Sequence, residues 1–290
     1  MRHFLRQAAL TAATLVLLLP AGAAEAAPGT AGPADGAGRA GGPAGAAKPD
    51  RRASEVTHGL GFEACTAPPL DTMRTWWDDS PYSAVGIYSS GSQRACGQPR
   101  LTADWVHQAL AMGWRLIPTH VGRQAPCNGD APQSGRLDPA HATEQGRAEA
   151  DEAVAGLTAL GLGPGNPVYL DIESYPGGND PTCVRAVVDA VLGWTDELHQ
   201  AGYLAGFYSS VDSGVHDLIA AVRAGRSPAP DVLWYARWDH AADTAGSGTV
   251  PDDLWADQQR IHQYDGDVRE TWGGVTLNID RDRLDAPSAG

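Results

Sequence analysis

Short runs of apolar, β-branched and aromatic residues recur eight times between residues 59 and 280, and most are separated by stretches of helical periodicity. We expect strands at residues 59–65, 83–88, 114–121, 168–174, 203–209, 232–238, 260–264 and 275–280. Strands that alternate with helices in this way form a TIM-type barrel or a doubly wound open sheet. Because the first turn lacks a Gly-x-Gly-x-x-Gly phosphate loop, we favour an α/β fold of the (β/α) barrel type.

The segments between the strands predict helices and one irregular connection. Helices are expected at residues 70–77, 102–112, 139–160, 182–200 and 215–224, with a short one at 252–257. Thr102 can cap the second helix and Gly113 can end it. In the third helix, Glu149 is expected outside the apolar face that contains Ala153 and Leu157. The last two strands are too close in sequence for a crossover helix, so we predict an irregular, single-domain barrel that ends in a hairpin.

The first 26 residues have the layout of a secretory signal peptide, in which a short basic start precedes an apolar run and the site Ala24-Glu25-Ala26. The run is too short for a typical transmembrane span, and an uncleaved anchor is the alternative. Without a twin-arginine pair before it, Sec-type export is favoured. Residues 27–53, rich in Ala, Gly and Pro, predict a disordered linker. The barrel domain is therefore expected at 54–286.

Charge and hydropathy exclude two classes of partner. The chain has 21 Lys and Arg against 35 Asp and Glu, and its formal net charge is −14. Nucleic acid is a polyanion, so we expect no nucleic-acid partner. No later stretch is apolar enough to span a bilayer, so no membrane partner is expected after signal cleavage.

The chain has four cysteines, Cys65, Cys96, Cys127 and Cys183. An even number of cysteines in an exported chain favours disulfides over free thiols. No Cys-x-x-Cys pair is present, which argues against zinc. Three pairings are possible, and we prefer Cys65 with Cys96 and Cys127 with Cys183 because each then joins neighbouring connections.

Two acids interrupt the apolar run at 168–174. Side chains alternate across a strand, so Asp171 and Glu173 share one face while Val168, Leu170 and Ile172 share the other. Removing a carboxylate from water costs several kcal/mol unless it is paired. The two acids are therefore either a structural pair or an acid/base or nucleophile pair at the end of a barrel strand.

The carboxyl ends of barrel strands converge on one mouth, so the polar residues there are candidate site residues. They are Glu63, His120, Asp171, Glu173, Gln263 and Asp280. Four carboxylates in one mouth repel one another, so at least one should stay protonated near neutral pH, as a general acid requires. Aromatic residues expected there are Tyr88, Tyr175, Tyr208, Trp234 or Tyr235, and Trp238. Flat rings beside carboxylates suit a sugar ligand.

Some candidates have simpler interpretations. His120 is alternatively a hydrogen-bonded structural residue, and Asp280 alternatively belongs to a charged surface turn at 280–282. A metal site at Asp171, Glu173 and Asp280 is conceivable, but no histidine clusters with them. We therefore expect neither metal nor cofactor.

Five motifs in chain order carry a family resemblance from about His58 to Leu284. They are Gly61-Phe62-Glu63-Ala64-Cys65, Tyr169-Leu170-Asp171-Ile172-Glu173, Gly202-Tyr203 with Gly206-Phe207-Tyr208-Ser209, Trp234-Tyr235-Ala236-Arg237-Trp238, and Gln263-Tyr264 followed by Ile279-Asp280. The set resembles a secreted glycoside-hydrolase-like family (domain of unknown function 1906). That family is similar to the family 25 glycoside hydrolases, the Chalaropsis-type barrel lysozymes that cleave the glycan of peptidoglycan. The resemblance implies an irregular barrel and a cell-wall glycan substrate.

The resemblance also implies roles for the acids. Glu173 would be the proton donor to the leaving oxygen, and Asp171 would orient or electrostatically support either Glu173 or the reacting sugar. Glu63 and Asp280 would be the acids of the first and last strands, although the related pattern usually has Asp where this chain has Glu63. Tyr88, His120, Tyr175, Tyr208, Trp238 and Gln263 are the expected substrate-binding residues.

The leading interpretation is a secreted, monomeric, lysozyme-like glycosidase that acts on cell-wall polysaccharide and associates with the wall. The first alternative is a glycan-binding barrel without hydrolytic activity. The second is a purely structural secreted protein, which would require Asp171 and Glu173 to be buried in ion pairs away from any pocket.

Overall fold

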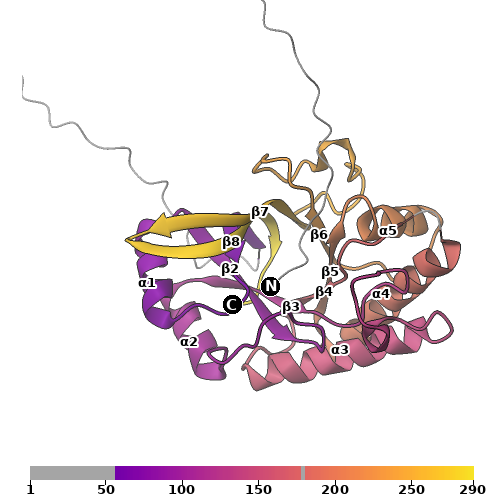
Figure 1. Cartoon of the computed structure of the whole chain (residues 1–290), viewed down its shortest axis with the longest axis horizontal. Coiled ribbons are helices and arrows are strands. Elements are labelled where there is room, and N and C mark those ends of the chain that lie inside the picture. Colours follow the sequence, from indigo (N-terminus) through magenta and orange to yellow (C-terminus); the bar gives the residue numbers. More distant parts are fainter. Residues whose placement is uncertain (1–55, 178–179) are drawn as a thin grey trace, which may run out of the picture. The chain divides into compact units, whose positions relative to one another are not determined.

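Eight strands close into one barrel, in chain order, in the computed structural model of the protein, which describes residues 56–177 and 180–290 (Figure 1). The strands are β1 (Val56–Glu63), β2 (Tyr82–Ser90), β3 (Arg115–His120), β4 (Pro167–Asp171), β5 (Leu204–Ser210), β6 (Val232–Ala236), β7 (Arg260–Trp272) and β8 (Val275–Pro287). The predicted barrel is confirmed, and the open sheet is excluded. The expected signal peptide and linker, at 1–26 and 27–53, lie outside the described residues.

The last strand runs against its neighbours. Strands β1 to β7 are parallel, whereas β8 is antiparallel to both β7 and β1. Gly273 and Gly274 join β7 to β8 with positive φ angles of 56° and 80°, which suit a tight two-residue hairpin turn. The predicted hairpin is confirmed, and its arms are much longer than expected. Its far end lies beside the first helix, α1 (Leu70–Asp79), where the Trp76 indole donates to the Val275 carbonyl at 3.2 Å.

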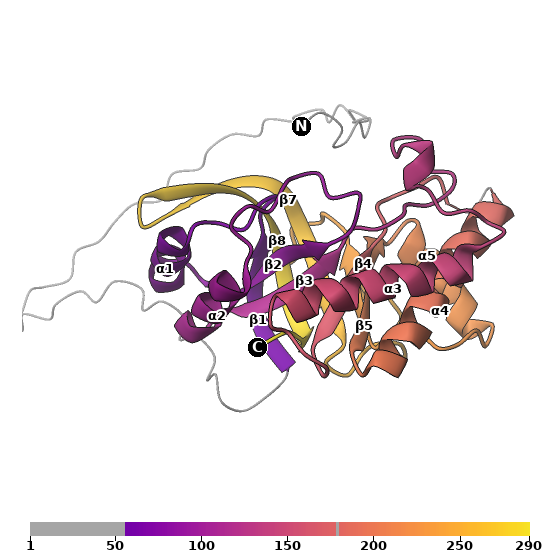
Figure 2. The same cartoon turned by 90° about the horizontal axis from the view of Figure 1, so that it is seen from below.

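Helices fill most of the parallel connections. Besides α1, they are α2 (Ala103–Met112), α3 (Ala142–Ala159), α4 (Pro181–Ala201) and α5 (Gly214–Arg223), and Figure 2 shows α3 lying along the outside of the barrel. The predicted ends of α2 are confirmed, because the Thr102 side chain accepts from the Trp105 N–H and Gly113 has a φ of 101°. No described helix is long and apolar enough to cross a membrane.

The connection from β6 to β7 differs from the prediction. The helix expected at 252–257 is wrong, because this segment forms turns and the described connection contains only a 3-10 turn at Gly246–Gly248. Trp255 and Gln258 have positive φ angles of 50° and 57°, which a right-handed helix does not allow. The Trp255 indole donates to the Pro230 carbonyl at 2.7 Å and fixes the turn against the barrel.

Strand alternation divides the buried side chains into two layers. Inside the barrel lie Ala84, Ile117, Tyr169, Val232, Trp234, Ile261, Leu284 and Ala286. The larger layer, between strands and helices, includes Val168 and Leu170 from β4. The predicted faces are thus confirmed for β4, but the strand ends at Asp171, so Glu173 lies on the loop that follows it.

One helix prediction is wrong for an electrostatic reason. Glu149 was expected outside the apolar face of α3, but it is buried. Its Oε2 lies 2.7 Å from Nε2 of His120, and its Oε1 lies 3.5 Å from Nε of Arg123. These partners offset the loss of hydration, which apolar periodicity alone does not reveal.

Both preferred disulfides are confirmed. Cys65–Cys96 joins the segment after β1 to the connection between β2 and α2. Cys127–Cys183 joins the loop after β3 to the first turn of α4.

Gly206→Ala is expected to lower the free energy of unfolding by about 1–3 kcal/mol or more, because a Cβ there would lie 2.3 Å from the Tyr169 ring inside the barrel. That ring is fully buried, and its hydroxyl donates to the Pro287 carbonyl at 2.9 Å, so it has little room to shift. Urea unfolding measures the loss. Gly97→Ala is the control, since a Cβ there has no neighbour within 4 Å. Equal stability of the two variants would contradict the packing argument.

Candidate active site

Acids from the first and last strands face each other at the barrel mouth. Glu63 ends β1 and is the register partner of Asp280 on β8. Asp280 and Asp282 share the alternation of Leu284 and Ala286, which point inward. Asp280 therefore lies within a strand and not in a surface turn. Asp282 was not predicted as a site residue, although extending the strand by two positions would have found it.

Glu63 is held by two neighbours. It is 4% exposed, its Oε1 accepts a hydrogen bond from the Gln263 side-chain amide, and its Oε2 accepts from the Tyr88 hydroxyl at 3.5 Å. Burial raises the pKa of Glu63 well above its ordinary value, and the charges of Asp282 and Asp280 raise it further. The protonated form of Glu63 is therefore favoured.

Gln263 links the acids to the aromatic residues of the mouth. Its Oε1 accepts from the Tyr208 hydroxyl and from the Trp238 indole, both at 3.0 Å, which turns its amide nitrogen toward Glu63. Trp238 is 37% exposed at the rim. The structure thus brings together four of the expected substrate-binding residues, Tyr88, Tyr208, Trp238 and Gln263.

Asp171 and Glu173 lie at the end of β4, in different environments. Asp171 is 4% exposed, and its buried Oδ1 has no hydrogen-bond partner within the described residues. Glu173 is partly exposed. Neither carboxylate forms an ion pair with a described residue, so the purely structural alternative lacks the pairs it requires.

Gln124 fixes the backbone around these two acids, and sequence reasoning missed it. Its Oε1 accepts from the Glu173 N–H at 2.8 Å. Its Nε2 donates to the carbonyls of Asp171 at 3.0 Å and Gly122 at 3.2 Å. Because it lies in an irregular loop, no periodicity marks it.

The mouth carboxyls have raised pKa values. Burial, and then the charge of Asp280, raise the pKa of Glu173 to about 7. Burial raises the pKa of Asp280 to about 6, although an N–H donated by Asp267 opposes the rise. Asp171 and Asp282 have pKa values well above the ordinary range, through burial and through the charges of Glu173 and Asp280 respectively. For Asp282, the Trp234 indole opposes the rise by donating at 2.9 Å.

Two expected site residues lie elsewhere. His120 is fully buried outside the barrel interior. Its Nδ1 is hydrogen-bonded to Ser90 Oγ at 2.8 Å, and its Nε2 is hydrogen-bonded to Glu149. The Tyr175 hydroxyl donates to Asp217 of α5 at 2.8 Å, and its ring belongs to the outer layer. The expected placement of both at the mouth is therefore corrected, because both are used to attach loops and helices to the barrel.

One described group of side chains has metal-ligand geometry. His120, Glu149 and Glu152 offer ligand atoms within 4.8 Å of one another. However, His120 and Glu149 already bond each other, and Arg123 adds a positive charge beside them. The alternative metal set of Asp171, Glu173 and Asp280 is not among the groups found in the described chain.

The mouth can therefore supply a proton at neutral pH. Glu173 is partly exposed and titrates near pH 7, while Asp280 keeps more of its charge there because its pKa is lower.

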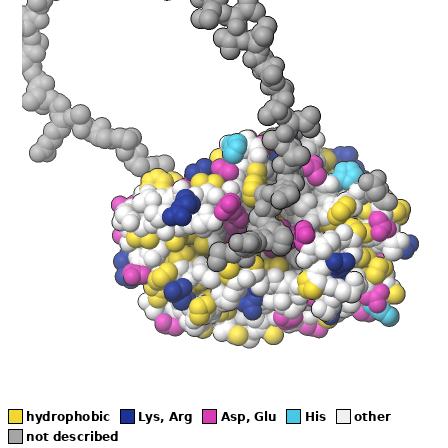
Figure 3. Space-filling model, viewed as in Figure 1, with side chains coloured by type: hydrophobic (Ala, Val, Ile, Leu, Met, Phe, Trp, Pro, Cys, Tyr) yellow, Lys and Arg dark blue, Asp and Glu magenta, His cyan; other side chains and the backbone are white. Residues whose placement is uncertain are grey.

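On the face shown in Figure 3, basic side chains are spread singly among acidic and apolar ones.

Residues 74–284 match the family described as the Rv2525c-like, glycoside hydrolase-like domain. Among curated proteins, none matches this chain.

Solved structures with low sequence identity share the fold. The Mycobacterium tuberculosis Tat-secreted protein Rv2525c, in complex with L-tartrate, has a TM-score of 0.54 at 14% identity over 80% of this chain and 99% of its own. An uncharacterized B. stearothermophilus protein has a TM-score of 0.51 at 15% identity, over 78% and 95% of the two chains. The modular autolysin LytC from Streptococcus pneumoniae has a TM-score of 0.50 at 12% identity, over 77% of this chain and 46% of its own.

Glu173→Gln is expected to stabilise the fold at high pH and not at low pH. The folded-state pKa of about 7 exceeds the ordinary 4.5, so the carboxyl favours folding below about pH 4.5, and this benefit is lost as pH rises through 7. We expect the variant to be more stable than the wild type by on the order of 1–3 kcal/mol near pH 8.5, and equal to it near pH 4. Urea unfolding at both pH values measures the difference. The exposed Glu152→Gln is the control, and a Glu173→Gln effect independent of pH would contradict the assignment.

Proposed function

We propose that this chain, which belongs to the family of Rv2525c-like, glycoside hydrolase-like domains, is a secreted hydrolase of cell-wall polysaccharide with Glu173 as its general acid. The observation that carries the proposal is the state of this carboxyl, which is partly exposed in a mouth of further acids and has a pKa of about 7. The fold likeness to an autolysin supports the choice of a wall glycan.

In the proposed reaction, Glu173 protonates the oxygen of the glycosidic bond as that bond breaks. The sugar then develops positive charge, as in an oxocarbenium ion. Asp280 is the acid best suited to stabilise this charge, because its pKa of about 6 leaves it mostly ionised at neutral pH. Asp171 and Glu63, whose pKa values burial raises well above the ordinary range, would hold the substrate and Glu173 by hydrogen bonds.

Besides the carboxyls, the aromatic side chains of the mouth are suited to bind a sugar. Trp238 offers an exposed ring at the rim, and its indole N–H is fixed by Gln263. The apolar face of a sugar ring can stack there, while Tyr88 and Tyr208 line the same mouth. We propose these residues as the substrate-binding set.

The proposed location is outside the cell, associated with the wall. Two disulfides and no described free cysteine fit an oxidising compartment. The signal peptide expected at 1–26 and the linker at 27–53 would export the barrel and tether it. We further propose that the protein is a monomer and needs no cofactor.

A second candidate is a glycan-binding barrel without turnover. The observation in its favour is Glu63, which stands where the related pattern usually has Asp and whose carboxyl is already bonded to Gln263 and Tyr88. The side chain of Glu63 is one methylene longer than that of Asp, which displaces its carboxyl by about 1 Å. A displacement of this size in a reacting group can cost on the order of a hundredfold in rate.

Glu173→Gln should lower the release of reducing sugar from purified peptidoglycan by about 10²–10⁴-fold, the usual contribution of a general acid. Glu152→Gln, at an exposed position of α3, should keep wild-type activity. The glycan-binding candidate gives another pattern: no turnover, and binding to insoluble wall material that Trp238→Ala weakens but Glu173→Gln does not. That pattern would replace the hydrolase proposal.

The pH dependence of kcat/KM should be bell-shaped, with a maximum between about 6 and 7. Activity requires ionised Asp280, whose pKa is about 6, and protonated Glu173, whose pKa is about 7. Rates should therefore fall below the first value and above the second. In Asp280→Asn the fall on the acid side should disappear, and the alkaline fall should move to lower pH, because the charge of Asp280 no longer raises the pKa of Glu173. An alkaline limit far above pH 8 would argue against Glu173 as the acid.

A further inference from the structure

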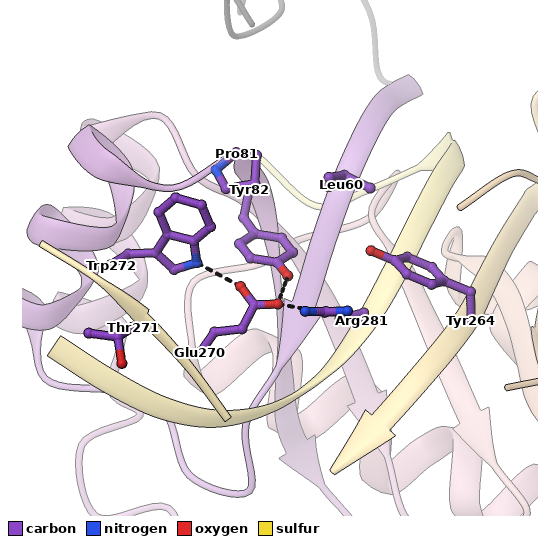
Figure 4. Close-up of a pocket in the computed structure, with 8 residues that line it drawn as sticks. All are labelled: Leu60, Pro81, Tyr82, Tyr264, Glu270, Thr271, Trp272 and Arg281. Carbon is purple, nitrogen blue, oxygen red and sulfur yellow. Dashed lines mark hydrogen bonds and ion pairs between the residues drawn. The ribbon is translucent and has the colours of Figure 1, made fainter. Parts of the chain in front are cut away.

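A pocket of about 390 Å³ lies beside strands β1, β7 and β8 (Figure 4). It is lined by Leu60, Pro81, Tyr82, Tyr264, Glu270, Thr271, Trp272 and Arg281. Arg281 alternates on β8 with Asp280 and Asp282, which face the interior, so the pocket and the mouth occupy opposite faces of the same strand. Its volume is within the range of small-molecule sites.

The pocket exists because the last connection is a hairpin. Helices cover most of the parallel connections from outside, but β7 and β8 are joined by two glycines. The outer face of β1, β7 and β8 is therefore left partly open, and Trp272 and Thr271 on the hairpin form one side of the pocket.

The polar base of the pocket is rigidly built around Glu270. Its Oε1 accepts from the Tyr82 hydroxyl at 2.8 Å and from Nε of Arg281 at 2.5 Å, and its Oε2 accepts from the Trp272 indole at 2.6 Å. Three donors on one carboxylate, two from aromatic side chains, fix all four groups in place. Such preorganisation lowers the entropic cost of binding a ligand.

Donors remain available at the same base. Arg281 donates from Nε to Glu270 and from Nη1 to Asp265, at 3.1 Å, and no described residue accepts from its other N–H groups, which can donate to a ligand. Within the described residues, the Tyr264 hydroxyl has no hydrogen-bond partner, and Figure 4 shows it directed toward Arg281. A ligand here meets donors from Arg281 and Tyr264 and an acceptor in Glu270.

The charges of the pocket indicate the ligand class. The positive charge of Arg281 is balanced by Glu270, and Asp265 lies on its other side. An anion would meet two carboxylates, and a cation would meet the guanidinium, so neither is favoured. The walls of Leu60, Pro81 and the Trp272 ring are apolar. A sugar has both hydroxyls and an apolar face, and it matches this combination without a net charge.

We propose that this pocket is a second carbohydrate site, which holds a neutral sugar unit of the polysaccharide while another part of the polymer occupies the mouth. The choice of wall polysaccharide as ligand rests on the proposed function. The site would raise affinity for the insoluble polymer and leave the reaction with short soluble fragments unchanged, because only a polymer can occupy two sites at once.

The test is sedimentation of the full chain with insoluble purified peptidoglycan, in a Glu173→Gln background that prevents turnover. Trp272→Ala should weaken binding about tenfold, and Tyr264→Phe, which removes only the unpartnered hydroxyl, should weaken it a few-fold. Arg269→Ala is the matched control, because Arg269 is exposed on the same hairpin and does not line the pocket. Thermal melts confirm that each variant is folded, and Trp272→Phe should recover part of the binding lost in Trp272→Ala.

The outcomes separate the two proposals. If folded Trp272→Ala and Tyr264→Phe bind as well as the parent, or if the parent does not bind, the pocket proposal is overturned whatever the activity. If both lose binding but wild-type protein releases no reducing sugar, the pocket stands and the hydrolase proposal fails. With native Glu173, both variants should cleave soluble peptidoglycan fragments at the wild-type rate. A parallel loss of that activity would place the pocket residues in the mouth and overturn their separate role.

Discussion

The antiparallel pairing of β8 with β1 is the contact on which the rest of the structure depends. A two-glycine link cannot return the chain to the start of the next strand, so β8 must run back along β7. It then closes the barrel against β1 in a register that places Asp280 opposite Glu63. The mouth thus receives acids from the middle of its last strand, whereas an all-parallel barrel would supply them only from strand ends. The antiparallel course of β8 therefore both closes the barrel and supplies acids to the mouth.

The free-energy cost of burying several acids in one mouth is reduced by protonation more than by ion pairs. Basic residues bond acids outside the barrel interior, as Arg281 does with Glu270 and Arg123 with Glu149. Inside the mouth, Gln263, Tyr88 and Trp234 supply neutral donors. Burial and mutual repulsion then raise the pKa values of the carboxyls in unequal steps. Unequal values let neighbouring acids take different roles at one pH.

The sequence predicted the parts of this protein that follow simple periodicity. Strand alternation identified the eight strands and the inward face of Asp171, the short last connection indicated the hairpin, and capping chemistry predicted both ends of α2. It failed where a tertiary contact decided the outcome. Glu149 was expected outside the apolar face of α3 because nothing local signals its bond to His120. The segment around Trp255 does not form the expected helix, because the Trp255 indole donates to the distant Pro230 carbonyl. Gln124 has no periodic signal, and Asp282 lay just past the expected strand end.

Gln124 gives the backbone of Glu173, the proposed proton donor, a support that does not change with pH. A charged group that held the Glu173 backbone would attract or repel the carboxyl differently before and after proton transfer, and the loop would shift with each turnover. An uncharged amide bonded to the Glu173 N–H and to the Asp171 and Gly122 carbonyls feels little of that change. The backbone around Glu173 can therefore stay still while its side chain gains and loses a proton, so the mouth would have the same shape at the start and end of the proposed reaction.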